Sequence, residues 1–169
     1  MSISIAETTK NLKFIVEDLP ELTEQANAHI ASSNMSSQVS FLGHDFFKPQ
    51  PEAVRHATVY FLSNVLHDWP TDKCQLIMKN IVDVMQPGNS IILLEQVLPK
   101  PGQLLEFQEA AIRAQDLGMF GFLTARERSV ADFETLMKTV DPRLKLFGVI
   151  GPPKMKRNSL IEFRLEAAT

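Results

Sequence analysis

The sequence predicts an α/β fold built on a mainly parallel sheet, and three observations lead to it. Short apolar runs alternate along the chain with longer amphipathic runs, as strands alternate with helices in such folds. The most apolar run, residues 90–97, is typical of a central strand covered on both faces. Two later runs separated by Gly-Pro-Pro predict a closing antiparallel pair.

The first half of the chain contains three expected strands and two expected helices. Residues 12–17 predict a strand that ends at Asp18-Leu19-Pro20, and a helix follows to about residue 31. Short strands are expected at 39–42 and 58–62. Apolar side chains then recur at helical spacing from about 72 to 85, and Pro87-Gly88 ends this second helix.

The second half begins with the central strand and continues with two more helices. A Met- and Phe-rich helix is expected over 104–122, and Ser129 is typical of the N-cap of the next one. Residues 144–150 and 159–165 are the expected last strands. The apolar stripe of the helix over 104–122 either lines a pocket or packs in the core, and packing in the core is the commoner role.

Composition indicates one folded domain, residues 1–169, in a reducing compartment. Apolar residues make up 44% and charged residues 22% of the chain, as in ordinary globular proteins. A net charge of −3, with Lys154, Lys156 and Arg157 as the densest basic group, argues against nucleic acid as a partner. No apolar run is long enough to cross a membrane, and the single Cys74 reads as a buried packing thiol. We therefore expect a cytoplasmic protein.

His67 is the leading candidate for a catalytic group. It follows an apolar run directly, in the segment Leu66-His67-Asp68-Trp69, so it stands where the chain leaves the sheet and side chains face a ligand. Its imidazole exchanges a proton near neutral pH, which suits a general base. The alternative is a partly buried loop histidine held by hydrogen bonds.

Four titratable residues come at or near the carboxyl ends of predicted strands. They are Asp18, Asp45, His67 and Glu95. Because ligands bind beyond the carboxyl ends of strands in open α/β sheets, we expect all four at one rim. The alternative for Asp18 and Asp45 is that each caps a helix or faces solvent. The four histidines, at 29, 44, 56 and 67, have no ligand-like spacing, so no metal is expected.

Five segments carry a resemblance to a known family, in the family's order and within residues 3–165. They are 14–20 (FIVEDLP), 43–47 (GHDFF), 66–69 (LHDW), 93–95 (LLE) and 126–129 (RERS). These resemble the motifs of plant and fungal O-methyltransferases of the caffeate and flavonoid type, which methylate small aromatic hydroxyls with S-adenosylmethionine. The resemblance implies a class I methyltransferase sheet, a seven-stranded Rossmann-like fold.

The resemblance also implies roles for single residues. The family's base falls on His67, and its flanking carboxylates fall on Glu95 and Glu127. Its ribose-binding acid falls on Asp18, and Asp45 with Phe46 falls where the adenine is bound. Leu19 and Ser63, the latter near the adenine, are the other expected cofactor-binding positions. Many members have Lys or Arg where this chain has Ser63. Asp68, Met119, Phe120 and Phe122 are similar in type to substrate-binding positions.

By the same resemblance, the chain corresponds to the C-terminal catalytic region of the family. Residues 2–7 resemble the helix just beyond the family's glycine-rich turn, so we expect the first strand, that turn and the N-terminal dimerisation domain to be absent. The first strand would lie between strands 12–17 and 58–62, and two unpaired sheet edges are expected there.

Three functions remain open on the sequence. The first is an S-adenosylmethionine-dependent O-methyltransferase, either a shortened copy or one completed by a second copy or another chain. The second is a catalytically inactive relative that binds a small molecule or a partner protein. The third, less favoured, is a methyltransferase-like enzyme that catalyses a different rearrangement. The acceptor hydroxyl and the oligomeric state do not follow from the sequence.

Overall fold

The computed structural model describes residues 1–151 and 158–168, which form two compact units, Met1–Val54 and Arg55–Thr169. Each unit joins strands to helices, so the predicted α/β fold class is confirmed. The basic group at Lys154, Lys156 and Arg157 lies outside the described residues. None of the described helices has the length and apolar character required to cross a membrane.

The first unit is a two-stranded parallel sheet with helices packed beside it. In chain order it contains α1 (Ser2–Thr8), β1 (Phe14–Asp18), η1 (Pro20–Leu22), α2 (Thr23–Ser32), β2 (Val39–Gly43) and η2 (Glu52–Val54). Asp18 pairs with Gly43 at the carboxyl end of the two strands. Ala6, Ile30 and Val39 form its small core. Both predicted strands are present, and each ends one residue later than expected.

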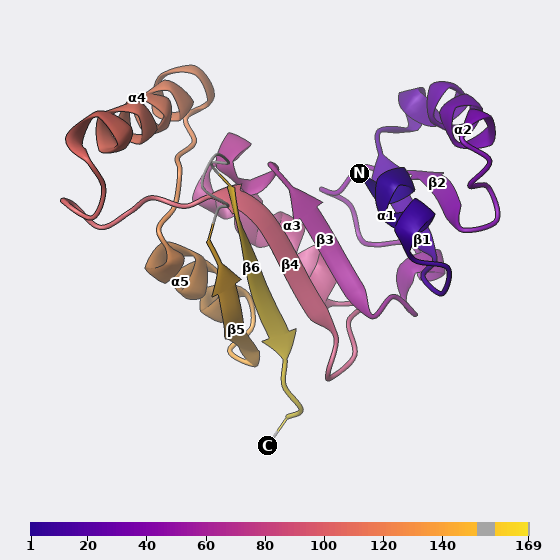
Figure 1. Ribbon diagram of the computed structural model, residues 1–169. Helices are drawn as coiled ribbons and strands as arrows, with labels where there is room; N and C mark the ends of the chain where they lie inside the picture. The colour runs from indigo at the N-terminus through magenta and orange to yellow at the C-terminus, as the bar shows by residue number, and fades with distance from the viewer. Residues whose placement is uncertain (152–157, 169) are drawn as a thin grey trace. The chain divides into compact units, whose positions relative to one another are not determined.

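The second unit is a mixed four-stranded sheet in the order β3-β4-β6-β5. The strands β3 and β4 are parallel, and β6 runs antiparallel to both β4 and β5, which confirms the closing pair. Helices α3 and α5 lie on one face of this sheet (Figure 1). The bounds are β3 (Val59–Ser63), η3 (Leu66–Asp68), α3 (Thr71–Val82), β4 (Ser90–Gln96), α4 (Glu106–Leu123), α5 (Val130–Val140), β5 (Leu144–Ile150) and β6 (Asn158–Leu165).

Helix α3 is shorter than the sequence predicts. It ends at Val82, whereas the apolar spacing continues to Met85. The backbone N–H groups of Val84 and Met85 donate to carbonyls three residues back, so the chain continues as tight turns. Both side chains are still buried, which explains why the periodicity extends past the helix end.

The face of the second sheet opposite α3 and α5 carries exposed apolar side chains. Val59, Phe61, Phe147, Ile150 and Leu160 are exposed on it, although sheets of this class are normally covered on both faces. Within the described residues β3 pairs only with β4, and β1 only with β2, so the two expected sheet edges are observed. The described residues hold six strands, β1 to β6.

Candidate active site

His67 lies in the short 3-10 turn η3, which follows β3 directly. Asn64 adopts a left-handed conformation with φ of 53°, and this turns the chain out of the sheet. The backbone N–H groups of Val65 and Leu66 then donate to Glu95 Oε1, at 3.0 and 2.8 Å. Glu95 comes from the carboxyl end of β4, so the central strand fixes the turn that carries the histidine.

Glu127 is the second carboxylate beside His67. Its Oε1 lies 3.3 Å from His67 Nδ1, and its side chain is fully buried, whereas 14% of the histidine side chain is exposed. Helix α4 contacts the same residue twice. Gln115 Nε2 donates to Glu127 Oε1 at 2.9 Å, and the Glu127 N–H donates to Asp116 Oδ1 at 2.9 Å.

The charges around His67 favour its protonated form. The hydrogen bond with Glu127 raises the pKa of His67, partial burial opposes this, and the negative charge of Glu95 adds to the rise. Burial in turn raises the pKa of Glu95, while its bonds from backbone N–H groups oppose that shift. On the other side of the ring, His67 Nε2 lies 3.5 Å from Asp68 Oδ1.

Arg128 holds the same turn from a third side. Its guanidinium is buried and donates from Nη1 to the Leu66 carbonyl at 2.6 Å and from Nη2 to the Trp69 carbonyl at 3.1 Å. The Cys74 thiol donates to these two carbonyls at 3.2 and 3.3 Å. Cys74 is completely buried and burial raises its thiol pKa, so the expected packing role is confirmed.

Several buried polar atoms around this turn lack a hydrogen-bond partner within the described part of the chain. They are Glu95 Oε2, Glu127 Oε2 and Arg128 Nε. Buried polar groups are nearly always paired in folded proteins, so these atoms have hydrogen bonds still to make. The cluster therefore has hydrogen-bonding capacity available for a bound molecule.

The expected cofactor-binding residues other than Ser63 lie in the first unit. Asp18 and Asp45 follow the parallel strands β1 and β2, and their Oδ1 atoms accept from the N–H groups of Leu19 and Phe47 at 2.8 and 3.0 Å. The His44 N–H donates to the Asp18 carbonyl, which ties the two loops together. His44 Nε2 is buried and has no partner among the described residues.

The remaining expected residues have different surroundings. Phe46 packs edge-on against Phe47 with ring centroids 4.8 Å apart. Ser63 ends β3 and accepts a hydrogen bond from Asn64 Nδ2 at 3.2 Å. Met119 is half-buried, whereas Phe120 and Phe122 are 66% and 91% exposed. No residue of α4 is buried, so core packing does not explain its apolar stripe.

The structure brings His67, Glu95, Glu127 and Asp68 together in the second unit. Asp18 and Asp45 are neighbours in the first unit, and the expected common rim of all four strand-end residues stays a prediction. Sequence reasoning missed Gln115, Asp116 and the anchoring role of Arg128. Arg128 belongs to the RERS segment, which the family resemblance had already marked. No sequence pattern marks Gln115 or Asp116.

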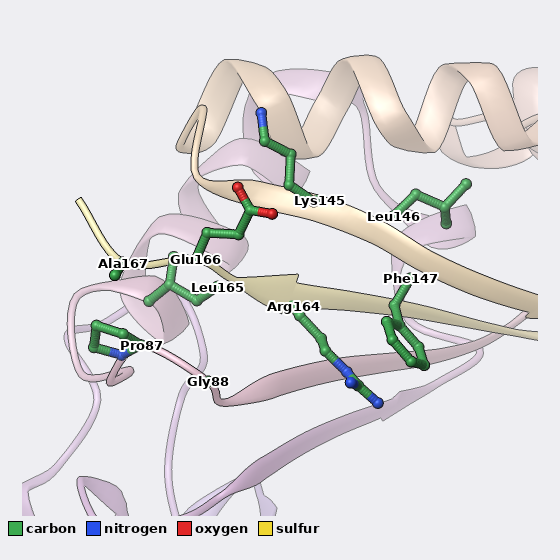
Figure 2. A pocket seen from close by; sticks show the side chains of 9 residues that line it. All are labelled: Pro87, Gly88, Lys145, Leu146, Phe147, Arg164, Leu165, Glu166 and Ala167. Atoms are coloured by element: carbon green, nitrogen blue, oxygen red, sulfur yellow. The ribbon is translucent and has the colours of Figure 1, made fainter. Parts of the chain in front are cut away.

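A separate cavity of about 540 Å³ lies at the opposite end of the second sheet from Glu95 (Figure 2). The residues that line it precede β4 (Pro87, Gly88), belong to β5 (Lys145, Leu146, Phe147), or end and follow β6 (Arg164, Leu165, Glu166, Ala167). Arg164 extends over the Phe147 ring there, 3.1 Å from its centroid. In the described residues no cluster of three or more histidine, cysteine or acidic side chains could hold a metal ion.

Comparisons with known proteins identify the family and the fold. Residues 3–140 match the family of the O-methyltransferase domain. The O-methyltransferase fsr2 of Gibberella fujikuroi is 38% identical over 98% of this chain and 42% of its own length. The chain thus spans less than half of this curated relative.

Two solved structures have the same fold. LepI in complex with SAM is 26% identical with a TM-score of 0.83, over 98% of this chain and 40% of the other. A structure described as a pericyclic reaction enzyme is 26% identical with a TM-score of 0.82, over 97% and 39%. The expected class of methyltransferase fold is therefore confirmed, and the chain belongs to the O-methyltransferase family.

Proposed function

We propose that the chain carries the catalytic part of an S-adenosylmethionine-dependent O-methyltransferase that acts on a hydroxyl of a small aromatic metabolite. His67 is the general base, and Glu127 and Glu95 support it. The observation that carries this proposal is the contact of 3.3 Å between His67 Nδ1 and the buried Glu127 Oε1. It is the arrangement expected of a base held by an acidic partner.

In this proposal each nitrogen of His67 has its own role. Glu127 accepts a hydrogen bond from Nδ1–H, which leaves Nε2 of the neutral ring as the proton acceptor. S-adenosylmethionine, when bound, supplies a methyl group activated by the positive charge on its sulfur. The hydroxyl of the acceptor passes its proton to Nε2, and the two carboxylates stabilise the imidazolium that results.

The first unit contains the groups that suit the nucleoside part of this cofactor. Asp18 is exposed at the end of β1, and its carboxylate suits the two hydroxyls of a ribose. Asp45 and Phe46 add a polar and an aromatic side chain just after β2, and the buried His44 Nε2 beside them has no partner among the described residues. Leu19 lies beside Asp18, and Ser63 ends β3 in the second unit.

Helix α4 supplies the side chains for an aromatic acceptor. Met119, Phe120 and Phe122 lie in its last turns, within one short segment after Gln115 and Asp116. Exposed aromatic and methionine side chains of this kind are typical of surfaces that cover an apolar ligand. In this proposal Asp68, next to His67 Nε2, accepts a hydrogen bond from a second polar group of the acceptor.

The test begins with calorimetric titration of the chain with S-adenosylmethionine and with S-adenosylhomocysteine. Methyl transfer from the labelled donor to a panel of phenols follows, with His67→Gln and, as the matched control, His56→Gln at an exposed histidine. We expect micromolar binding and a loss of transfer of about 10²–10⁴-fold in His67→Gln only. A folded chain that binds neither compound, or a His67→Gln variant with unchanged turnover, contradicts the proposal.

A second candidate function is a rearrangement of a small metabolite without methyl transfer. One observation favours it: a structure described as a pericyclic reaction enzyme has the same fold at 26% identity. Under this function the chain binds the cofactor but leaves every acceptor of the panel unmethylated. Binding together with labelled product excludes it.

A further inference from the structure

Helix α4 buries no residue against the rest of the second unit. It has 18 residues and none of them is buried, so apolar packing contributes little to its position. Phe107, Leu117 and Phe120 are each more than 60% exposed. Two polar side chains of this helix nevertheless make close contacts with one residue, Glu127.

The chain path after α4 makes these two contacts possible. Thr124 adopts the left-handed conformation with φ of 54° and ends the helix. The Ala125 N–H then donates to the Met119 carbonyl, so the chain reverses and runs back along the last turns of the helix. Arg128 forms a parallel bridge with Val97 after β4. Glu127 is therefore placed between α4 and the end of the central strand.

We propose that Gln115 and Asp116 are positioning residues through which helix α4 orients the Glu127 carboxylate toward His67. Asp116 fixes the backbone of Glu127 by accepting from its N–H at 2.9 Å. Gln115 fixes the side chain by donating from Nε2 to Oε1 at 2.9 Å. Helix α4 thereby holds both the backbone and the carboxylate of Glu127.

Gln115 donates its hydrogen bond to the Glu127 oxygen that faces the histidine. Glu127 Oε1 is both the acceptor for Gln115 and the atom 3.3 Å from His67 Nδ1, whereas Oε2 has no partner among the described residues. The last torsion of a glutamate side chain has only a broad preference, so hydrogen bonds decide the orientation of its carboxylate. Gln115 selects the orientation in which Oε1 meets the ring.

The other groups near His67 do not contact its Nδ1. Glu95, on β4, acts on the ring through its charge, and its Oε1 accepts from the backbone of the turn instead. Asp68, in the turn itself, faces Nε2. The Arg128 guanidinium bonds to main-chain carbonyls on either side of His67. Of the contacts named here, only that of Glu127 is to Nδ1. It is shorter and more buried than the contact of Asp68 to Nε2, so the orientation of Glu127 selects the tautomer of the ring.

The role in catalysis rests on the proposed function, but the positioning itself does not require turnover. Nitrogen-15 NMR of the chain labelled at histidine reports the tautomer and the pKa of His67 directly. The signal is assigned by its loss in His67→Gln. We compare the wild type with Gln115→Met, which keeps the side-chain length and removes the donor. Gln108→Met, the same change at an exposed position of the same helix, is the matched control.

We expect the neutral ring of the wild type to carry its proton mainly on Nδ1. In Gln115→Met the Nε2–H tautomer should increase and the pKa of His67 should fall toward its ordinary value, because the carboxylate no longer holds one orientation. Gln108→Met should leave both signals unchanged. Asp116→Ala should act like Gln115→Met, and Asp116→Asn, which keeps the acceptor oxygen, should restore the wild-type tautomer.

If His67 kept its wild-type tautomer and pKa in a folded Gln115→Met chain, the inference would be wrong. Gln115 would then only supply a hydrogen bond to the buried Glu127 oxygen, without orienting it. Where methyl transfer is measurable, Gln115→Met should lower kcat and leave the KM of the acceptor nearly unchanged. Failure of cofactor binding contradicts the proposed function and leaves the NMR result to decide the positioning role by itself.

Discussion

His67 Nδ1 and Glu127 Oε1 lie 3.3 Å apart, although 60 residues separate them in the chain. The histidine follows a strand and the glutamate follows a helix, so only the packed second unit brings them together. The contact raises the pKa of His67 in the folded protein, and it therefore links folding to pH.

The first prediction concerns that linkage. A histidine whose pKa is raised by folding stabilises the folded state fully below its unfolded pKa, about 6.5, and the gain is lost as pH rises through the folded pKa. We expect Glu127→Gln to flatten this fall in the free energy of unfolding, measured with urea across that pH range. His56→Gln, at an exposed site, should keep the wild-type dependence. An equal fall in wild type and Glu127→Gln would contradict the linkage.

The second prediction concerns Arg128, which anchors the turn of His67. Arg128→Met leaves the Leu66 and Trp69 carbonyls without their charged donor in a buried place, so we expect a loss of about 2–4 kcal/mol in the free energy of unfolding. Arg126→Met is the control, because that side chain is 53% exposed and its ion pair with Asp132 is 3.7 Å long. It should change stability by no more than about 0.5 kcal/mol. Equal effects would refute an anchoring role.

The third prediction concerns a glycine at the candidate nucleoside site. A Cβ added at Gly43 would lie 2.8 Å from Pro20 Cα, a backbone atom that moves only with its whole loop. We expect Gly43→Ala to destabilise the first unit by about 1–3 kcal/mol and to displace the loop that carries Asp18. Gly121→Ala, on the exposed surface of α4 with open space around it, should instead stabilise by roughly 0.5–1 kcal/mol. Thermal unfolding of both variants measures the difference, and a neutral Gly43→Ala would show that the loop adapts.

Local patterns in the sequence were enough to predict most of the fold. Strands such as 58–62 came within a residue of β3 because a short apolar run between breakers has few alternatives. Ser129 was predicted as an N-cap, and it forms a full capping box with Asp132. The end of α3 was missed, because buried residues continue past the helix and periodicity does not distinguish a helix from successive turns.

The site was harder to predict, because its contacts join distant residues. The pairing of His67 with Glu127 was expected only through the family resemblance. Gln115 and Asp116 are polar residues of an amphipathic helix, and such residues normally face solvent. Their partner Glu127 stands beyond a chain reversal that the sequence does not mark. The apolar residues of α4 would normally be expected in the core, and the sequence gives no sign that none of them is buried.

The last prediction separates two roles of Glu95, the acceptor for the turn and the negative charge near His67. Glu95→Gln keeps an oxygen that accepts from the N–H groups of Val65 and Leu66 but removes the charge. Burial raises the pKa of Glu95, so its ionised form is destabilising at neutral pH, and we expect Glu95→Gln to be as stable as the wild type or more so.

Glu95→Leu, the matched apolar variant, leaves both N–H groups unpaired, so it should cost about 2–4 kcal/mol in urea unfolding. The pKa of His67 should fall in both variants, because each removes a negative charge that favours the imidazolium. If Glu95→Gln were as destabilised as Glu95→Leu, the charge and not the hydrogen bonds would hold the turn. The histidine would then depend on Glu95 for its place in the fold as well as for its protonation.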